Sequence, residues 1–368
     1  MRKLANTLPI EMEHLENKET VSVIIPAYNA EAFITEAIKS CAAQTYRPIE
    51  VVVVNDGSTD ATPTIVKKIG NTLRSKIELN LTDVNPNQGA ANALRIGFSN
   101  AKGKFVCWLS ADDLFIDKEK VARQVQCMER TDAAWSYYRY FYAGSNLSNA
   151  RLLKPSYLPW LGLLDPIFVR DADLRLMLLL FKSPINGSSI MIRKECIEKY
   201  GTFDPVTRNV DGDGDLWMRY SSLGLKVVAL NGAPVFYREH PMQTSKKQLV
   251  MLYGCDLTRL RMLSFLERGG RLVGLIKKFA LFFPLVVETN YHKARPFVSE
   301  FLFKYIIDHK KELGKILSIY AQKALKDVET EIDQFGLDRK KCAHEAEIFK
   351  HSSAFKSFEH VSFEKRLR

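Results

Sequence analysis

The chain has 368 residues, of which 46% are hydrophobic and 26% are charged, and its formal net charge at pH 7 is +11. These fractions are those of an ordinary globular protein, long enough for one large domain or for a domain with a sizeable extension. The sequence excludes a disulfide-stapled scaffold and a membrane-spanning protein, because the six cysteines contain no CxxC pair and no stretch reaches the ~20 apolar residues that cross a bilayer.

The N-terminal residues and the charge distribution bear on location and partners. Residues 1–19 lack the apolar stretch of a secretory leader, so we expect an N-terminal tail and a cytoplasmic protein. Positive charge gathers from residue 246 onward, in pairs such as Lys277-Lys278 and Lys310-Lys311. No nucleic-acid-binding motif accompanies this charge, so we expect no nucleic acid and instead a peripheral contact with the inner face of the plasma membrane. A helical layer over the sheet, or a contact between two copies of the chain, is the alternative.

Residues 20–130 alternate between short apolar runs and amphipathic segments with the period of a helix. The run 50–54 is apolar almost throughout, which is typical of a strand buried on both faces. This alternation predicts an α/β fold, Rossmann-like, with a mostly parallel sheet flanked by helices. The expected strands are 21–25, 50–54, 77–81 and 105–109, and the expected helices include 30–44 and 89–101.

The pattern changes after residue 130, where the chain becomes rich in Tyr, Trp, Leu and Pro. The elements expected there are a helix at 174–181, a strand at 188–192 and a helix at 215–223. From residue 248 the sequence is amphipathic, basic and helical in pattern to its end. We therefore expect a tail over 1–19, one domain over 20–247 divided into 20–130 and 131–247, and a basic helical extension over 248–368.

Aspartates follow two of the expected strands. Asp56 comes after the strand 50–54, and Asp112 and Asp113 come after the strand 105–109. Ligands of open α/β sheets collect beyond the carboxyl ends of the strands, and Mg²⁺ or Mn²⁺ binds there through one or two carboxylates plus substrate phosphates. The pair therefore suggests a metal–phosphate site. A turn that caps the next helix, and an Asx turn at Asp56, are the purely structural alternatives.

A third acidic segment, Asp-Gly-Asp-Gly-Asp at 211–215, begins like a calcium-binding EF-hand loop. Such a loop needs Gly at its sixth position and Glu at its twelfth, where this chain has Leu216 and Ser222. We therefore expect one carboxylate to cap the following helix and Asp215 to pair with Arg219 one turn later. The chain also lacks GxxxxGK[ST] and a GxGxxG after its first strand, so phosphate charge would have to be met by a metal and basic side chains.

Seven motifs in series resemble the inverting family 2 glycosyltransferases of the GT-A fold, over about residues 20 to 245. They are VIIPAYN at 23–29, VVNDGSTD at 53–60, NQG at 87–89, SADD at 110–113, GTFD at 201–204, DGDLWMR at 213–219 and YREH at 237–240. The resemblance implies a GT-A catalytic domain over 20–247, with a nucleotide-sugar half at 20–130 and an acceptor half at 131–247.

Carried onto this sequence residue by residue, the resemblance implies a nucleotide-sugar site, a divalent metal and a catalytic base. The residues that would contact the nucleotide sugar are Pro26, Ala27, Tyr28, Asn29, Asp56, Asn87, Gly89, Ser110, Ala111 and Asp112. The metal, Mg²⁺ or Mn²⁺, would be bound by Asp112, Asp113 and His240, and Asp213 would be the catalytic base.

Three positions depart from the family pattern. Ser110 stands where the DxD motif has its first carboxylate, Gly212 where many members have Glu before the base, and Leu94 where many have Arg. Ser110 therefore changes or removes one contact with the metal or ribose. Gly212 removes one means of tuning the pKa of the base, and Leu94 removes a cation at the diphosphate. The minimal set of metal ligand, base and nucleotide pocket remains.

The resemblance implies metal-dependent, inverting transfer of a sugar from a nucleoside-diphosphate sugar, with UDP-sugars favoured. The acceptor would be a hydroxyl of a glycan or glycolipid in bacterial polysaccharide or lipopolysaccharide synthesis, and segment 135–185 is expected to form its wall. The alternative is a non-catalytic scaffold that binds a sugar nucleotide within a polysaccharide-synthesis complex. Ser110 and Gly212 favour this alternative, whereas the retained acidic residues oppose it.

Overall fold

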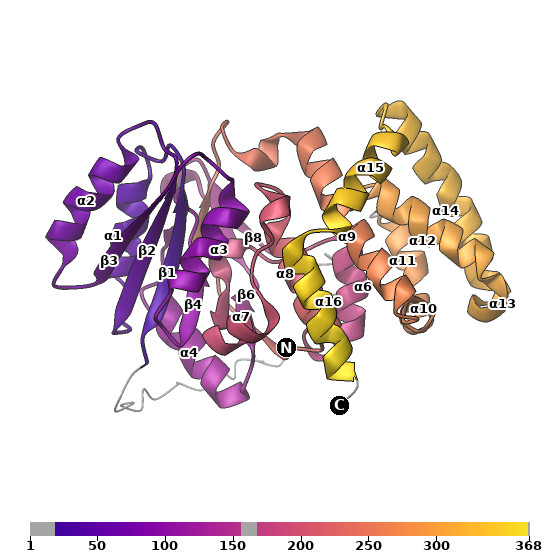
Figure 1. Cartoon of the computed structure of the whole chain (residues 1–368), viewed down its shortest axis with the longest axis horizontal. Helices are drawn as coiled ribbons and strands as arrows, with labels where there is room; N and C mark the ends of the chain where they lie inside the picture. Colours follow the sequence, from indigo (N-terminus) through magenta and orange to yellow (C-terminus); the bar gives the residue numbers. More distant parts are fainter. Residues whose placement is uncertain (1–18, 156–167, 291, 367–368) are drawn as a thin grey trace, which may run out of the picture.

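The computed structural model describes residues 19–155, 168–290 and 292–366. Its N-terminal part is built on a seven-stranded sheet in the order β10-β6-β9-β4-β1-β2-β3 (Figure 1). The strands are β1 (Val21–Ala27), β2 (Ile49–Asp56), β3 (Glu78–Val84), β4 (Phe105–Trp108), β6 (Trp135–Tyr138), β9 (Met191–Arg193) and β10 (Val227–Leu230). Strands β1 to β4 run parallel, which confirms the doubly wound arrangement predicted for this part of the chain.

Strands β1 and β2 lie next to each other inside the sheet because their residues are apolar on both faces. Every residue of β2 is buried, and Ile25 of β1 pairs with Val53 of β2. Strand β4 flanks β1 on the other side in the same direction. The carboxyl ends of these strands therefore meet at one edge of the sheet, where the loops after Ala27, Asp56 and Trp108 begin.

Helices cover both faces of the sheet. Helix α3 (Ala90–Asn100) packs so closely on β1 that a Cβ added to Gly97 would lie 2.2 Å from Cγ2 of Ile24. Three other helices bury their apolar stripes on the opposite face. They are α1 (Ile34–Ala42), α2 (Thr62–Leu73) and α4 (Lys120–Thr131).

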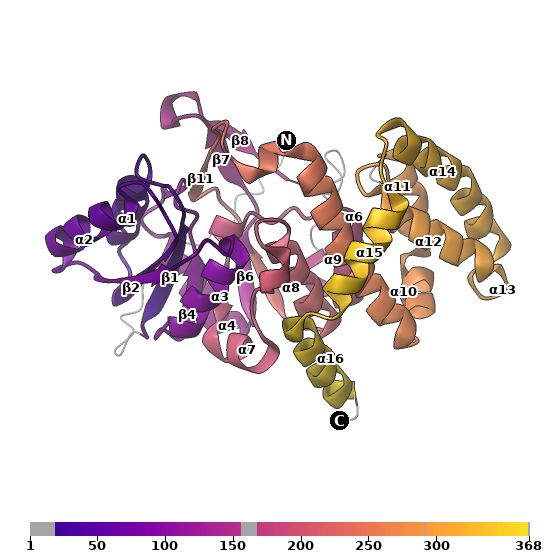
Figure 2. The ribbon, with the colours of Figure 1, turned by 45° about the horizontal axis from the view of Figure 1, so that its top comes forward.

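A second sheet, in the order β5-β11-β7-β8, lies just beyond β4, and Figure 2 shows β7, β8 and β11 together. Its strands are β5 (Leu114–Phe115), β7 (Phe141–Gly144), β8 (Arg151–Leu153) and β11 (Val235–Arg238). The sequence did not predict this sheet, because strands this short carry almost no periodic signal. Strand β5 pairs antiparallel with β11, more than a hundred residues later in the chain.

Two expected elements of the second half differ in detail. The strand expected at 188–192 is β9, which runs antiparallel to both β4 and β6 and begins only after the 3₁₀ turn η2 (Gly187–Ser189). The helix expected at 215–223 is α8, which already begins at residue 212. The helices of this half include α6 (Ala172–Phe181), α7 (Lys194–Tyr200) and α8 (Gly212–Ser222).

The chain from residue 248 on is helical, as expected. Its helices are α9 (Gln248–Arg268), α10 (Leu272–Phe279), α11 (Phe283–Glu288), α12 (Pro296–Asp308), α13 (Lys310–Leu313), α14 (Lys315–Gln334), α15 (Arg339–Lys350) and α16 (Ser353–Arg366). One hydrophobic cluster runs from β1 through α8 into these helices, so the extension and the sheet domain share a core. Within the described ranges, no helix combines the length and the apolar character that crossing a bilayer requires.

Part of the stretch that motivated the membrane expectation faces inward, although Leu281 within it is exposed. Nζ of Lys278 donates to Asp171 at 2.8 Å and to Asp173 at 3.2 Å. The side chains of Phe279 and Phe283, in the apolar run that follows, are fully buried. The buried side chains of this stretch therefore belong to a helical layer, and a membrane contact through the exposed ones stays a prediction.

Candidate active site

The carboxyl end of β4 brings two of the predicted site residues together. Oδ2 of Asp112 lies 2.9 Å from Nε2 of His240, which follows β11. Both side chains remain partly accessible, with 24% of Asp112 and 20% of His240 exposed. The His240 ring also packs against Phe33, with 5.1 Å between the ring centroids. A carboxylate and an imidazole that face each other at an accessible strand end are suited to share one cation.

Asp113, which was also expected to bind the metal, is placed differently from Asp112. Its carboxyl is buried, where Oδ2 accepts the hydroxyl proton of Ser188 at 2.6 Å and Oδ1 accepts the backbone N–H of Arg238 at 3.1 Å. Burial and the neighbouring charge of Asp112 raise the pKa of Asp113 well above its usual range. Asp113 therefore joins the end of β4 to η2 and β11, and leaves Asp112 alone to face outward.

Arg238 is a site residue that sequence reasoning placed in a motif but gave no role. Its Nε donates to the backbone carbonyl of Asp112 at 2.9 Å, and its Nη2 donates to Glu36 at 2.5 Å. Ser188 holds the other side of the same loop, because its hydroxyl accepts the N–H of Ser110 at 3.1 Å. Arg238 and Ser188 fix the backbone around Asp112. The sequence could not reveal this function, because both residues lie far from Asp112 along the chain.

Asp56, which the resemblance placed at the nucleotide, is buried and bonded to the loop before α3. Its Oδ1 accepts the N–H of Gln88 at 2.9 Å, its Oδ2 accepts the N–H of Gly89 at 2.7 Å, and only 2% of the residue is exposed. Asn87 closes the arrangement by donating from Nδ2 to the carbonyl of Asp56 at 2.9 Å. Asp56 is therefore an anchor for the loop before α3. The side chain that bonds the backbone of the turn after β2 is that of Asn55, whose Oδ1 accepts the N–H of Ser58.

Gly89 brings the two halves of the domain into contact. It has a φ of +95°, and an added Cβ would lie 3.0 Å from backbone atoms of Arg208. Just after it, the N–H of Ala91 donates to the carbonyl of Arg208 at 2.7 Å. Leu94, one of the departures from the family pattern, is buried in the core of α3 and does not replace the missing cation.

The loop after β1 carries the other predicted nucleotide-binding residues. Pro26 and Ala27 are the last residues of β1, and Tyr28 beyond them is 53% exposed. Asn29 has a left-handed backbone with a φ of 48°, and its Oδ1 accepts the N–H of Thr59 at 2.8 Å. The loops after β1 and β2 are thus tied to each other, with Tyr28 open to solvent. Ser110 and Ala111 lie across the sheet edge from them, after β4.

Asp213 is in the first turn of α8 and is half-buried. Burial and the charge of Asp211 raise its pKa to about 6, against the lowering effect of the backbone N–H groups of Gly214 and Asp213 and of the Arg259 charge. The carboxylate form still predominates at neutral pH, as a base requires.

The other two aspartates of this segment are held in ion pairs. Asp215 is fully buried and accepts from Nε of Arg219 at 2.8 Å, which confirms the predicted pairing one helical turn apart. Asp211 has a left-handed backbone and makes no side-chain cap to α8, so the predicted capping is not its role. Its carboxylate instead accepts from Thr258 and Arg259 of α9.

The start of α8 and the end of β4 belong to one neighbourhood. A Cβ added to Gly212 would lie 3.4 Å from Cβ of Ala91 and 3.6 Å from the ring of Phe203. The Phe203 ring in turn packs edge-on against Trp108, the last residue of β4, with 5.6 Å between centroids. Two aromatic side chains therefore connect the turn that carries Asp213 with the strand that leads to Asp112.

The site fits a divalent metal that is shared with a ligand better than one enclosed by protein. Among the described residues, no three His, Cys, Asp or Glu side chains gather as a complete metal cage. Asp112 and His240 offer two ligand atoms at a partly exposed position. Mg²⁺ and Mn²⁺ sites of this type are completed by phosphate oxygens and water.

Residues 22–200 match the model of the family described as Glycosyl transferase family 2. An uncharacterized glycosyltransferase of Rickettsia prowazekii is 32% identical over 203 residues, which are 54% of this chain and 58% of that protein. The Escherichia coli UDP-Glc:alpha-D-GlcNAc-diphosphoundecaprenol beta-1,3-glucosyltransferase WfaP is 26% identical over 222 residues, 60% of this chain and 78% of that protein. The chain thus spans little more than half of the Rickettsia relative.

The fold is similar to that of S. aureus TarS 1-349 in a crystal structure with UDP-GlcNAc. The TM-score is 0.56 with 19% identity, and the match covers 86% of this chain and 92% of that one. This likeness confirms the predicted GT-A fold with its C-terminal helices. Residues 22–200 are therefore similar to the glycosyl transferase family 2, and this match covers somewhat less than half of the chain.

Proposed function

We propose that this protein transfers a sugar from a nucleoside-diphosphate sugar to a hydroxyl of a glycan or glycolipid, with inversion at the anomeric carbon and with a divalent metal, Mg²⁺ or Mn²⁺. The observation that carries the proposal is the pairing of Asp112 with His240 at the accessible end of β4, connected through Phe203 and Trp108 to the turn of Asp213. This arrangement puts the proposed binding site for a metal–diphosphate complex, at Asp112 and His240, close to the proposed base Asp213.

In the proposed reaction, the acceptor hydroxyl attacks the anomeric carbon on the face opposite the diphosphate. The bond from the anomeric carbon to the diphosphate oxygen breaks as the new glycosidic bond forms, and the acceptor proton moves to the carboxylate of Asp213. Asp112 and His240 would hold the metal, which would offset the charge of the departing diphosphate. Arg238 holds the backbone of Asp112 during this step.

A UDP-sugar is the proposed donor. Two similar proteins support it, because the name of WfaP specifies UDP-Glc and TarS 1-349 was crystallised with UDP-GlcNAc. The acceptor in the name of WfaP is a diphosphoundecaprenol-linked sugar, which supports a lipid-linked glycan as the acceptor class here.

Hydrolysis of UDP-sugars with and without Mn²⁺ tests the proposal directly. We expect slow, Mn²⁺-dependent release of UDP from at least one UDP-sugar, lost in Asp213→Asn. A chain that binds UDP with Mn²⁺ but releases no sugar, with or without added lipid-linked glycans, would instead be a binding scaffold. Thermal-shift measurements with UDP-, GDP- and dTDP-sugars identify the donor first, because a ligand that binds only the folded state stabilises it.

We also propose peripheral contact with anionic lipid, through the end of the extension where α10 and α13 pack together. Two apolar side chains project there, Leu281 with 90% and Ile316 with 75% of its surface exposed. Lys310, Lys311 and Lys315 are exposed beside them. Apolar side chains surrounded by lysines are suited to the surface of an anionic leaflet.

Flotation with phosphatidylglycerol vesicles tests this contact. We expect binding that weakens with salt and is lost when Lys310 and Lys311 are changed to Glu. Exchange of Lys340 and Lys341 to Glu, which changes the charge equally on α15, is the matched control. Equal binding by both variants, or none by the wild type, would contradict a lipid contact at this end.

A further inference from the structure

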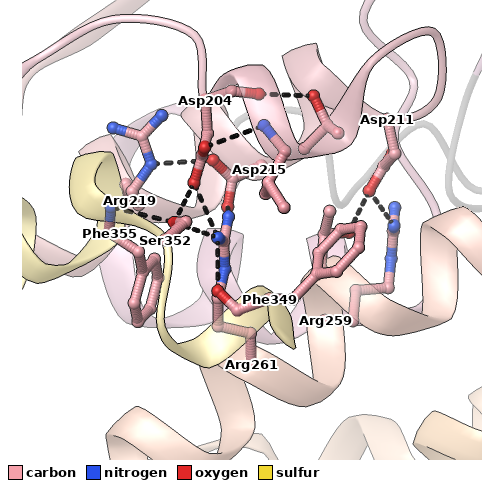
Figure 3. Close-up of polar contacts among 12 residues, drawn as sticks. Asp204, Asp211, Asp215, Arg219, Arg259, Arg261, Phe349, Ser352 and Phe355 are labelled. Carbon is pink, nitrogen blue, oxygen red and sulfur yellow. Dashed lines mark hydrogen bonds and ion pairs between the residues drawn. The ribbon is translucent and has the colours of Figure 1, made fainter. Parts of the chain in front are cut away.

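Two arginines of α9, Arg259 and Arg261, reach from the extension to the helix that carries Asp213 (Figure 3). Both side chains are almost completely buried, with 1% and 0% exposed. They lie two residues apart on one helix, but they hold different acids. Arg259 binds Asp211, just before α8, whereas Arg261 binds Asp215 inside it.

Arg259 is fixed by three acceptors. Its Nη1 donates to the carboxylate of Asp211 and to the carbonyl of Cys255 at 2.8 Å, and its Nε donates to the carbonyl of Leu179 at 3.1 Å. Thr258 adds its hydroxyl to the same Asp211 carboxylate. The guanidinium therefore has a defined position, because a planar fork with several acceptors has little freedom.

Asp211 transmits that position to the first turn of α8. Its backbone is left-handed, with a φ of 55°, and its carbonyl accepts the N–H of Asp215 at 3.0 Å. A Cβ added to Gly214 would lie 2.2 Å from Oδ1 of Asp211, so this carboxylate lies directly against the turn that contains Asp213. A non-glycine residue keeps a left-handed backbone when its surroundings hold it there, and here Arg259 and Thr258 do so.

Among charged residues, Asp211 and Arg259 have the largest effects on the pKa of Asp213. The Asp211 charge raises the pKa of Asp213 and the Arg259 charge lowers it. Two further titratable groups of α9, Cys255 and Asp256, lie near Arg259. Burial raises the pKa of both, to about 12 for Cys255 and to about 7 for Asp256, so Cys255 is an uncharged thiol at neutral pH. On the other side of α8, Asp215 is neutralised by Arg219 and Arg261.

We propose that Arg259 is a positioning residue for the proposed base: by holding Asp211 it fixes the turn that carries Asp213 and sets the charge that Asp213 experiences. The inference rests on the proposed role of Asp213. It gives the helical extension a part in the reaction, since the residue comes from α9 and not from the sheet domain.

Arg261 provides a matched control because it is equally buried but directed elsewhere. It donates to Asp204 at 2.7 Å and to Asp215 at 2.5 Å, and it also reaches the carbonyl of Phe349 and the hydroxyl of Ser352. These contacts bind α8 to the junction of α15 and α16 without touching Asp211. Loss of Arg261 would therefore remove stability but leave the charges beside Asp213 in place.

The test is the pH dependence of kcat at saturating donor, acceptor and Mn²⁺, measured on the full-length chain. For Arg259→Gln we expect kcat at its optimum to fall about 10- to 100-fold, because the base is displaced. The acidic limb of its pH–rate profile, where kcat falls as the pH is lowered, should move up by about one pH unit, because the cation that lowers the pKa of Asp213 is lost. Asp211→Asn should move the acidic limb down instead, since an anion is lost. Arg261→Gln should lower the melting temperature and leave the limb where it is.

Arg259→Lys keeps the charge but not the fork, so we expect a limb close to that of the wild type with part of the rate lost. Unmoved limbs in both Arg259→Gln and Asp211→Asn would overturn the inference, as would an equal movement in Arg261→Gln. If Arg259→Gln fails to fold, Asp211→Asn and Arg259→Lys decide. If Asp213→Asn itself keeps full activity, the proposed base is wrong, which is a different failure.

Discussion

The carboxylate of Asp112 lies 2.9 Å from the imidazole of His240, although 128 positions separate the two residues in the sequence. One follows β4 of the large sheet and the other follows β11 of the small sheet, so the contact depends on how the two sheets meet. The neighbour of Asp112, Asp113, is part of that junction because it accepts from Ser188 and Arg238. Adjacent aspartates thus have different surroundings, since Asp113 is buried against protein donors and Asp112 is partly exposed.

We expect Asp112→Ala to abolish transfer and to remove the effect of Mn²⁺ on UDP binding, because the hard carboxylate ligand is lost. His240→Ala should weaken the Mn²⁺ effect without abolishing nucleotide binding. Calorimetric titration of UDP with and without Mn²⁺ measures both. Asp113→Asn is the control, since its buried carboxyl has a strongly raised pKa and is replaced by a neutral group of the same shape. A wild-type Mn²⁺ response in Asp112→Ala, or its loss in Asp113→Asn, would reverse the assignment.

Asp56→Ala should destabilise the fold and weaken UDP binding whether or not metal is present. Two backbone N–H groups lose a charged acceptor, and such hydrogen bonds are worth about 1.5–3 kcal/mol each, so we expect a loss of roughly 3–6 kcal/mol in the free energy of unfolding. Urea unfolding measures this loss. Asp83→Ala removes an exposed carboxylate from the neighbouring strand β3 and should have a much smaller effect. Equal stabilities of the two variants would mean that Asp56 does not anchor the loop.

Asp213→Asn should lower kcat by roughly 10²-fold or more and leave the affinity for UDP almost unchanged, because a base acts only in the transition state. With the pKa of Asp213 at about 6, the wild-type rate should fall as the pH is lowered through about 6. Asp215→Asn should lose stability first, since it leaves Arg219 and Arg261 buried without their shared acceptor. If Asp213→Asn kept the normal rate while Asp215→Asn folded but was inactive, the base would have to be reassigned to Asp215.

Asp256 should make the protein less stable as the pH rises from about 4 to 7. Burial raises the pKa of its carboxyl to about 7, above the value of 3.8 in an unfolded chain. The folded state therefore binds the proton more tightly, so this contribution is fully present below the unfolded value and is lost as the pH rises through about 7. Melting temperatures between pH 5 and 8 should fall less steeply in Asp256→Asn than in the wild type. Parallel curves would show that Asp256 ionises in the folded state as it does when unfolded.

Local apolar runs in the sequence determined β1, β2 and β4, because the residues of these strands are mostly buried and turn residues follow them. Strand β3 lies at the edge of the sheet, where apolar and polar residues alternate and none is buried. The aspartates at strand ends were predictable too, since the carboxyl ends of parallel strands meet at one edge. The Asp215–Arg219 pair was also predictable, because residues four apart on a helix face each other.

Only the tertiary structure decided which way the side chains at these positions face. The sequence predicted the strand that forms β9, but its antiparallel direction depends on β4 and β6, which lie far away in the chain. The small sheet is built from strands of two to four residues, which carry little pattern of their own. The sequence placed Asp56 and Asp113 correctly at strand ends but could not reveal that loop N–H groups and Ser188 occupy their oxygens. Arg259 and Arg261 were simply two basic residues of an extension, and their role depends on an acid brought to them by packing. A carboxylate faces a ligand or the protein according to which donors the fold presents to it, and those donors come from residues distant in sequence.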